Sequence, residues 1–451
     1  MSDSSAADDR DRLSSLVADA TRRGADGADA VLIRATSLSH AQRLGEIEKL
    51  ERQESFDLGL RVFRGRKQAI VSSTDFSDDA LSGLLDRALD MAAAVPEDPW
   101  CGLADPDQLV QQKPELDMVD PVEPPGEALV EMARACEDAA RAVDGVTNSE
   151  GAEASWSRTE ITLAASNGFA DGYARTDSGV GVSVIAGEGA GMEAEYDFAH
   201  AVHMPDLEDP AEMGQRAGER ATARLGARRM PTSQVPVVFD PRVAGGLLGH
   251  LAGAISGPAI ARGTSFLKDN LGDALFGDDI QVVDDPHRPR GLRSKPFDAE
   301  GVANTKRSII ENGVLTTWLL DLASARQLGL ETTGHAGRGT SGPPSPGPSN
   351  LYLAAGSQTP DQLMSDIDSG LYITSLMGMG VNAVTGDYSR GASGFWIENG
   401  EISFPVTEMT IAGNLRDMYR SLTPADNLEF RYGTNSPTVR IDGMTVAGAA
   451  D

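Results

Sequence analysis

The first hundred residues alternate between the spacing of strands and the spacing of a helix. Apolar and polar residues take turns over Gly27–Arg34 and Ser55–Gly65, a pattern typical of half-buried strands. After Ser77, leucines and alanines recur at helical spacing until Pro96. That spacing predicts a helix with a serine cap, which the proline ends because it lacks an amide hydrogen. Residues 1–100 are therefore expected to form an N-terminal α+β subdomain.

A stretch rich in proline and aspartate, residues 96–126, leads into a second region with the same mixture of patterns. We expect two helices here, and two strands that turn at Asn167-Gly168, a pair favoured in type I′ hairpins. The predicted helices span about 127–143 and 211–225, and the predicted strands span 160–165 and 168–175. Residues 115–226 are expected to form a middle α+β subdomain.

From about Gln234 the pattern becomes that of β structure. Hairpins are predicted at three pairs between alternating segments, namely Asn312-Gly313, Asn399-Gly400 and Asp442-Gly443. Between them, Gly337–Asn350 holds too much glycine and proline for regular structure and is expected to be a flexible, functional loop. Residues 234–451 are expected to form a β-rich C-terminal domain. The predicted fold class is α+β, with an N-terminal mixed α/β region followed by a mainly antiparallel β C-terminal domain.

Charge and composition exclude several classes of function. The 451 residues include 68 Asp and Glu against 39 Lys and Arg, a formal net charge of −29. Proteins that bind a phosphate backbone need clustered Lys and Arg, so we expect no direct nucleic-acid partner. The uncharged stretch between Arg242 and Arg262 is rich in glycine and too weakly hydrophobic to cross a membrane. With an acidic N-terminus and only two cysteines, the chain is expected to be cytoplasmic.

Histidines and adjacent aspartates could build a metal site, but their spacing assigns none. His200 and His203 lie three positions apart, so on a strand they would point to opposite faces. His250 lies in the glycine-rich stretch without the second histidine and the glutamate of an HExxH zinc helix. Asp284-Asp285 precedes Pro286, and a turn is favoured there over a cation site. From the residues alone, no catalytic and no metal-binding residue is predicted.

The C-terminal region resembles a known family. Residues 380–406, GVNAVTGDYSRGASGFWIENGEISFPV, and residues 409–418, MTIAGNLRDM, closely resemble the PmbA/TldE branch of the TldD/PmbA family. Shorter landmarks follow the family's order at residues 45–48 (GEIE), 263–267 (GTSFL), 284–286 (DDP), 297–301 (FDAEG) and 324–329 (SARQLG). Together they cover residues 25–448, nearly the whole chain.

This resemblance implies a subunit of a cytoplasmic TldD/TldE heterodimer, a metallopeptidase that cleaves unfolded peptides. In that pair, the TldD-type chain holds zinc on an HExxxH helix and through a later cysteine. Here the matching stretch, Val243–Pro258, has glycine and alanine in place of the motif, and no cysteine follows Cys136. The departure matches the TldE side, so no catalytic, metal or cofactor residue carries over, and zinc is expected in the TldD-type partner. The family's other name, modulator of DNA gyrase, would then describe an indirect effect.

Two loops are predicted to face the proteolytic chamber, the peptide or the partner. One is the Pro/Gly loop around Ser341 and Asn350, and the other is the loop at Asp387 and Arg390. Loops of this kind often carry function, while the backbone edges of strands can hold an extended peptide with little sequence preference.

Two other interpretations stay open. The chain could be an autonomous metallopeptidase that binds its metal through ligands such as His200, His203 or Asp284. It could also be a homodimeric scaffold that binds peptides without catalysis.

Overall fold

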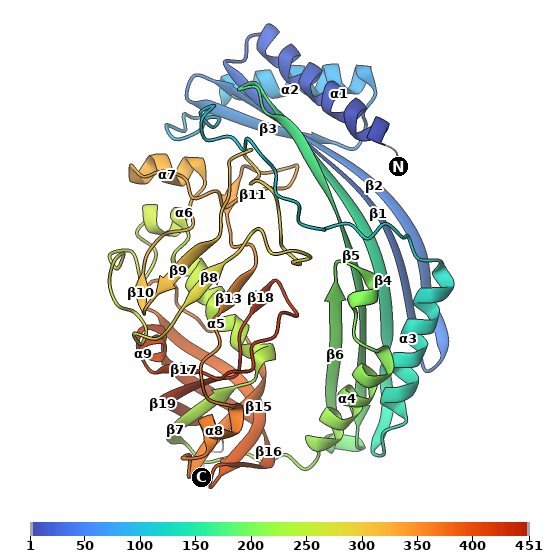
Figure 1. The fold of residues 1–451 in the computed structure, drawn as a ribbon, viewed down its shortest axis with the longest axis vertical. Helices are drawn as coiled ribbons and strands as arrows, with labels where there is room; N and C mark the ends of the chain where they lie inside the picture. Colours follow the sequence, from blue (N-terminus) through green and yellow to red (C-terminus); the bar gives the residue numbers. More distant parts are fainter. Residues whose placement is uncertain (1–2, 449–451) are drawn as a thin grey trace.

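The structure, a computed structural model, describes residues 3–448 and arranges them in two lobes (Figure 1). The first lobe is a long curved sheet with helices on its outer face, and the second lies on the inner side of the curve. The helices of the first lobe are α1 (Asp3–Arg22), α2 (Asp78–Ala94), α3 (Gly126–Arg141) and α4 (Pro210–Ala223). Its strands are β1 (Gly27–Arg43), β2 (Glu46–Arg64), β3 (Lys67–Ser73), β4 (Val146–Ala165), β5 (Ala170–Ala186) and β6 (Glu193–Ala201).

These six strands form one antiparallel sheet in the order β3-β2-β1-β4-β5-β6. At its centre β1 pairs with β4, from Asp29 opposite Ala165 to Gln42 opposite Ala152. Residues 1–100 and 115–226 therefore contribute to a single sheet. The predicted strands are present, and each of the long ones, β1, β2, β4 and β5, extends well beyond one of its predicted ends.

Alternation along the strands sends side chains to the two faces of the sheet. On the outer face, Leu58, Leu60 and Val62 pack in one apolar cluster with residues of α1 and α2. Further along the same face, Val180 and Val182 pack in a second cluster with residues of α3 and α4. The second lobe partly covers the inner face. In a third apolar cluster, Val31 and Leu163 of the sheet pack with Phe297, Val302 and Leu322 of the second lobe.

Local signals at the helix ends act as predicted. The Ser77 side chain accepts a hydrogen bond from the amide of Ala80, and α2 ends at Ala94, before Pro96. Helices α3 and α4 approach closely because α4 presents Gly214 at the crossing, where a Cβ would collide with the carbonyl of Cys136. Cys136 is buried in this contact, and burial raises the pKa of its thiol to about 12, so it is a core residue.

The second lobe contains a barrel and a smaller sheet. The barrel strands are β7 (Ser233–Phe239), β14 (Ser369–Met377), β15 (Asp387–Glu398), β16 (Glu401–Asn414) and β19 (Val439–Ala447), with β17 (Leu422–Pro424) added beside β19. Strand β16 pairs with both β15 and β19, which closes the ring. The smaller sheet has the order β10 (Val314–Leu315), β9 (Arg307–Glu311), β8 (Val282–Asp284), β13 (Leu351–Leu353), β18 (Thr434–Asn435).

Helix α5 (Pro241–Ala254) contacts both β14 of the barrel and β13 and β18 of the smaller sheet. Its Leu247, Leu248 and Leu251 are buried in the large core that both sheets share. The remaining elements are the helices α6 (Gly257–Ala261), α7 (Leu322–Leu328), α8 (Pro360–Met364) and α9 (Leu415–Arg420), the short paired strands β11 (Ala336–Gly337) and β12 (Ser345–Pro346), and the 3-10 turns η1 (Gly189–Gly191) and η2 (Met204–Asp206).

The predicted fold class, α+β with a mainly antiparallel second part, is confirmed, but two turn predictions are wrong. Asn312 and Asn399, like the glycines after them, have positive φ, as type I′ hairpins require. At Asn167-Gly168 only the glycine does, so the hairpin exists with a different turn. At Asp442-Gly443 there is no hairpin: β19 continues through, with a bulge between Ile441 and Met444 that the positive φ of Gly443 permits.

Within residues 3–448, no helix combines the length and the apolar character needed to cross a membrane.

Candidate functional site

The Pro/Gly loop, residues 337–350, is anchored rather than free. Strands β11 and β12 pair within it, Gly337 opposite Ser345, and so close the segment 338–344 between them. Its middle lies against the inner face of the first lobe, where the backbone of Thr340 occupies the space that a Cβ on Gly59 of β2 would need. The loop therefore bridges the two lobes, and the absence of a side chain at Gly59 of β2 permits this close approach.

Beside this contact lies a buried ion triad. Arg61 of β2 donates to Asp29 of β1, with Nε 2.8 Å from Oδ2, and Arg338 of the loop pairs with the other oxygen of Asp29. The three side chains are between 1% and 4% exposed. Burial alone would raise the pKa of Asp29, but the two guanidiniums outweigh it and leave that pKa lowered. The carboxylate is therefore ionised at neutral pH, and the triad ties the loop to the sheet.

The two loop residues predicted to face a peptide or partner have different surroundings. Ser341 is exposed, directly after Thr340. Asn350 is buried just before β13, where its Nδ2 donates to the carbonyl of Asp285 at 2.7 Å and its Oδ1 accepts from the amide of Arg293 at 2.9 Å. Asn350 thus positions the segment that follows β8. Of these two residues, Ser341 is the one whose side chain a peptide or partner could reach.

Behind the loop lies a cluster of buried polar side chains. Asp284, at the end of β8, accepts from the amide of Ser349 at 2.8 Å and from its hydroxyl at 2.6 Å. The Nε2 of His335 is 3.3 Å from the same carboxylate. Nearby, burial and the charge of Asp298 raise the pKa of Glu300 to about 8, so Glu300 is protonated at neutral pH. Asp284 therefore holds the loop in place through Ser349. The turn predicted at Asp284-Asp285-Pro286 is present.

The structure does not bring together the three side chains proposed as alternative metal ligands. On the inner face of β6, the Nδ1 of His200 is 3.0 Å from Asp177, and that hydrogen bond raises the pKa of His200. The Nε2 of His203 lies 3.1 Å from the carbonyl oxygen of Asp117, whereas Asp284 is engaged as described. Within the described part of the chain, no three His, Cys, Asp or Glu side chains are grouped closely enough to hold a metal ion.

The second prediction, a loop at Asp387 and Arg390, is wrong: both residues lie in the first part of strand β15, and the irregular segment before it is residues 378–386. The two residues again differ in their surroundings. Asp387 is exposed and accepts from the hydroxyl of Thr385 at 2.6 Å and from Asn414, contacts that lower its pKa. Arg390 lies further along β15, close to helix α5. Its Nε is buried and has no hydrogen-bond acceptor among the described residues.

Helix α5 and β15 meet at His250. Its ring packs edge-on against Tyr388, with the ring centroids 5.8 Å apart. Burial lowers the pKa of His250, and the positive charge of Arg390 lowers it further. His250 of the helix is therefore neutral, and it lies close to a buried tyrosine and a guanidinium from β15. Sequence reasoning identified Arg390 but missed its proximity to His250, because no local pattern connects residues so far apart in the chain.

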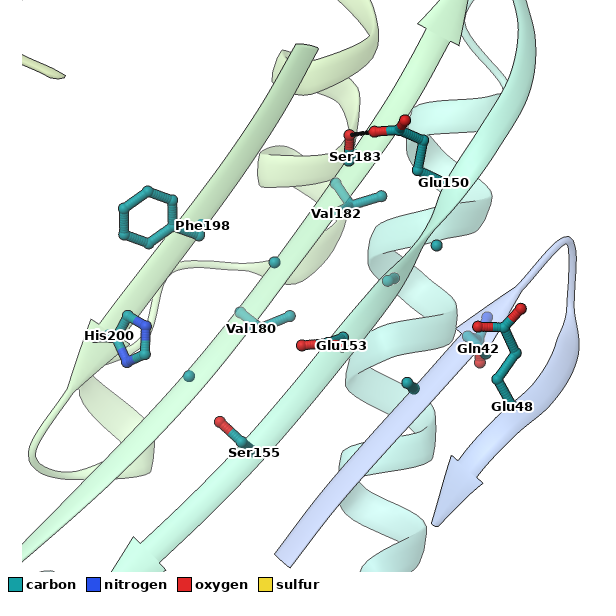
Figure 2. Close-up of a pocket in the computed structure, with 15 residues that line it drawn as sticks. Gln42, Glu48, Glu150, Glu153, Ser155, Val180, Val182, Ser183, Phe198 and His200 are labelled. Carbon is teal, nitrogen blue, oxygen red and sulfur yellow. Dashed lines mark hydrogen bonds between the residues drawn. The ribbon is translucent and has the colours of Figure 1, made fainter. Parts of the chain in front are cut away.

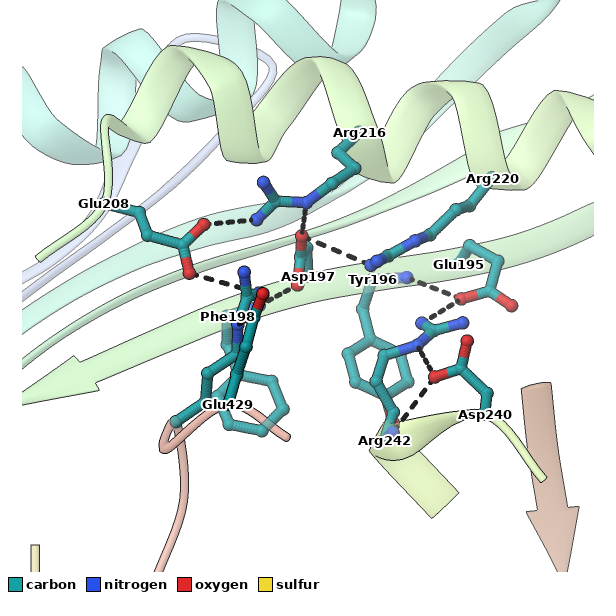
Figure 3. A network of polar contacts seen from close by, with 11 residues as sticks. Glu195, Tyr196, Asp197, Phe198, Glu208, Arg216, Arg220, Asp240, Arg242 and Glu429 are labelled. Atoms are coloured by element: carbon teal, nitrogen blue, oxygen red, sulfur yellow. Dashed lines mark hydrogen bonds and ion pairs between the residues drawn. The ribbon is translucent and has the colours of Figure 1, made fainter. Parts of the chain in front are cut away.

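A network of ion pairs joins the lobes where β6 and α4 meet the start of α5 (Figure 3). Arg216 of α4 bridges Asp197 of β6, at 2.7 Å, and Glu208, at 2.8 Å. From the second lobe, Arg431 reaches Glu208 at 3.1 Å, and Arg242 of α5 reaches the carboxylate of Glu195 at 3.3 Å. The arginines of this network therefore connect β6, α4 and the second lobe.

The inner face of the sheet also carries a groove with about 370 Å³ of space (Figure 2). We call it the inner-face groove. The residues that line it come from β6, β5, β4 and the β1–β2 hairpin. They include small residues, two residues with rings and three glutamates. They are Ser155, Gly179, Gly181 and Ser183 on the floor, Phe198 and His200 on β6, and Glu48, Glu150 and Glu153. Sequence reasoning missed this groove, although glycines at alternate positions of β5 signal a sheet face without side chains.

Comparison with known proteins covers almost the whole chain. Models of three domains match: PmbA/TldA metallopeptidase domain 1 at residues 28–92, the central domain at 119–225 and the C-terminal domain at 232–448. The metalloprotease PmbA of Escherichia coli O157:H7 is 39% identical over 94% of this chain and 92% of its own length. A metalloprotease PmbA homolog of Haemophilus influenzae is 36% identical over 97% of this chain and 96% of its own.

Solved structures show the same fold. A proposed modulator of DNA gyrase from Bacteroides thetaiotaomicron superposes with a TM-score of 0.90 at 25% identity, covering 98% of this chain and 99% of that one. TldE from Thermococcus kodakarensis superposes with a TM-score of 0.86 at 21% identity, covering 97% of this chain and all of its own. The chain belongs to the PmbA/TldD metallopeptidase family, in its PmbA/TldE branch.

Proposed function

We propose that this chain is the zinc-free, TldE/PmbA-type subunit of a cytoplasmic TldD/TldE heterodimer that cleaves unfolded peptides. In this proposal the chain supplies part of the wall of the proteolytic chamber, and a TldD-type partner supplies the zinc. Support comes from the family and from relatives named as metalloproteases or as TldE.

The surroundings of His250 carry the proposal. In the resemblance on which the family expectation rests, the zinc helix of a TldD-type chain corresponds to the stretch that forms α5 here. A zinc site at this place needs several anionic or neutral donors that converge on one point. In this chain His250 packs against Tyr388, and the guanidinium of Arg390 adds positive charge where a zinc ion would require electron donors. These residues do not fit a zinc ion, which supports a role without catalysis by this chain.

The loop before β15 is our proposed contact with the partner. Three large apolar side chains are exposed here, Met377 at the end of β14 and Met379 and Val384 in residues 378–386, and Met379 is 89% exposed. Exposed apolar side chains that lie together in one loop are typical of interaction surfaces. Asp387, the first residue of β15, follows this segment, and its exposed carboxylate would lie at the edge of the same contact.

Reconstitution with a TldD-type chain tests this proposal. We expect the two chains to elute together from a size-exclusion column and to cleave an unfolded, fluorogenic peptide at least about a hundredfold faster than either chain alone, since catalysis needs both zinc and an assembled chamber. Met379→Asp should weaken assembly, whereas Ile402→Asp, at a 45% exposed site on β16, should leave it unchanged. If the TldD-type chain cleaves the peptide equally well without this chain, the proposal is wrong.

A further inference from the structure

The inner-face groove lies on the face of the sheet opposite the helices, and the second lobe borders it where Tyr432 packs against Phe198. Figure 2 shows its lining residues on neighbouring strands of one face. The charged side chains that line it are Glu48, Glu150 and Glu153, all three exposed. Of these three glutamates, only Glu150 has a side-chain hydrogen-bond partner within residues 3–448, the hydroxyl of Ser183, so the lining can accept further hydrogen bonds from cations.

One wall of the groove is a ladder of rings along β6. Tyr196 stacks on Phe198 with centroids 6.1 Å apart, and Phe198 meets the ring of His200 edge-on at 5.9 Å. From the second lobe, Tyr432 packs against Phe198 at 5.3 Å. The face of the Phe198 ring attracts ammonium and guanidinium groups, so this ring and the carboxylates favour the same kind of ligand. His200 is paired with Asp177, which raises its pKa, so its imidazole takes no part in holding a cation.

The floor is flat because β5 has glycines where the rings lie. A Cβ on Gly179 would collide with the ring of His200, and one on Gly181 would press against the Cβ of Phe198. With these positions bare, the rings lie over β5 and an extended chain can approach the sheet between them and the glutamates.

The free edge of β6 is a less favourable place for a peptide. Among the described strands β6 pairs only with β5. The amides of Tyr196 and Phe198 donate to the preceding side chains, Glu195 at 3.4 Å and Asp197 at 3.0 Å. Strand addition along this edge would have to displace these bonds, whereas the face of the sheet offers an open groove.

We propose that the inner-face groove binds an extended peptide segment that carries lysine or arginine, with its cations between the glutamates and the ring of Phe198. The inference rests on the proposed peptide-handling function, for which it names the class of peptide. Because peptide binding is measured on this chain alone, the result tests this inference independently of assembly with a partner and of peptide cleavage.

The test is fluorescence anisotropy with a labelled, unfolded peptide of alternating lysine and serine, and with its glutamate counterpart. At low ionic strength we expect the lysine peptide to bind at least about tenfold more tightly, and the difference to shrink as salt screens the charges. The variant Glu48→Gln, Glu150→Gln, Glu153→Gln should weaken binding about tenfold, because three partly solvated ion pairs are removed.

A matched control removes the same charge from the outer face. Asp90→Asn, Glu127→Gln, Glu212→Gln changes exposed residues of α2, α3 and α4 and should alter binding less than about twofold. A second variant, Ser155→Arg, places a cation on the floor while keeping every carboxylate, and should weaken binding at least as much as the groove triple. Equal losses in the groove and control triples, equal binding of both peptides, or unchanged binding by Ser155→Arg would overturn the proposal.

Discussion

Replacing Asp29 with asparagine is expected to lower the free energy of unfolding by about 3–5 kcal/mol, because it leaves two buried guanidiniums without a counter-charge. The side chains of Arg61 and Arg338 are 4% and 1% exposed, so water cannot replace the lost carboxylate. The measurement is urea unfolding at neutral pH, followed by circular dichroism. Since Arg338 comes from the loop of the second lobe, the same variant should also expose residues 337–342 to faster hydrogen exchange.

The pH dependence of this effect follows from the lowered pKa of Asp29. A carboxylate whose folded pKa is below its ordinary value of 3.8 stabilises the fold above that value and loses this contribution as the pH falls through its folded pKa. The difference between the wild type and Asp29→Asn should therefore be largest near neutral pH and shrink in acid. The control is Asp86→Asn, which removes a 66% exposed partner of Arg23 and should cost at most about 1 kcal/mol. Equal effects of the two variants would contradict a structural role for the triad.

Replacing Gly59 with alanine is expected to destabilise the fold by about 1–3 kcal/mol, because the new Cβ would enter the space of the Thr340 backbone. Neither backbone segment can rotate away as a side chain could, so β2 and the loop must separate. Alanine normally gains stability over glycine in regular structure, which makes the expected sign informative.

The matched control is Gly83→Ala in α2, where an added Cβ meets nothing within 4 Å. This variant should stabilise the protein by up to about 1 kcal/mol. Chemical unfolding of both variants in the same buffer provides the comparison. A stabilising effect of Gly59→Ala would show that the loop does not rest on β2 in solution.

Elements determined by neighbouring residues could be predicted from the sequence. The serine cap of α2 and the Asn-Gly hairpins at Asn312 and Asn399 are local signals, and each acts as expected. Asp442-Gly443 misled the prediction because a glycine with positive φ suits a bulge as well as a turn. Strand β2 begins well before its predicted start. The pattern does not reveal residues 46–54 as a strand because they are exposed and lack the alternation of a half-buried strand.

The candidate site depended more on tertiary structure. The family resemblance pointed to the stretch that forms α5 and to Arg390, but the contact between His250 and Tyr388 requires β15 to pack on the helix. Asp29, Arg61 and Arg338 are distributed over both lobes, so their triad has no local sequence signature. The anchored loop shows the same limit, since its glycines and prolines predict irregular backbone without saying what that backbone contacts.

The central claim is that this chain contributes to peptide cleavage without holding zinc. Its most direct test is to purify the chain alone, without a metal-binding tag, and to measure bound zinc by mass spectrometry together with cleavage of an unfolded peptide. The account predicts zinc far below stoichiometry and no cleavage above the buffer control, with cleavage appearing when a zinc-loaded TldD-type chain is added. Stoichiometric zinc in this chain, together with cleavage by this chain alone, would contradict the account.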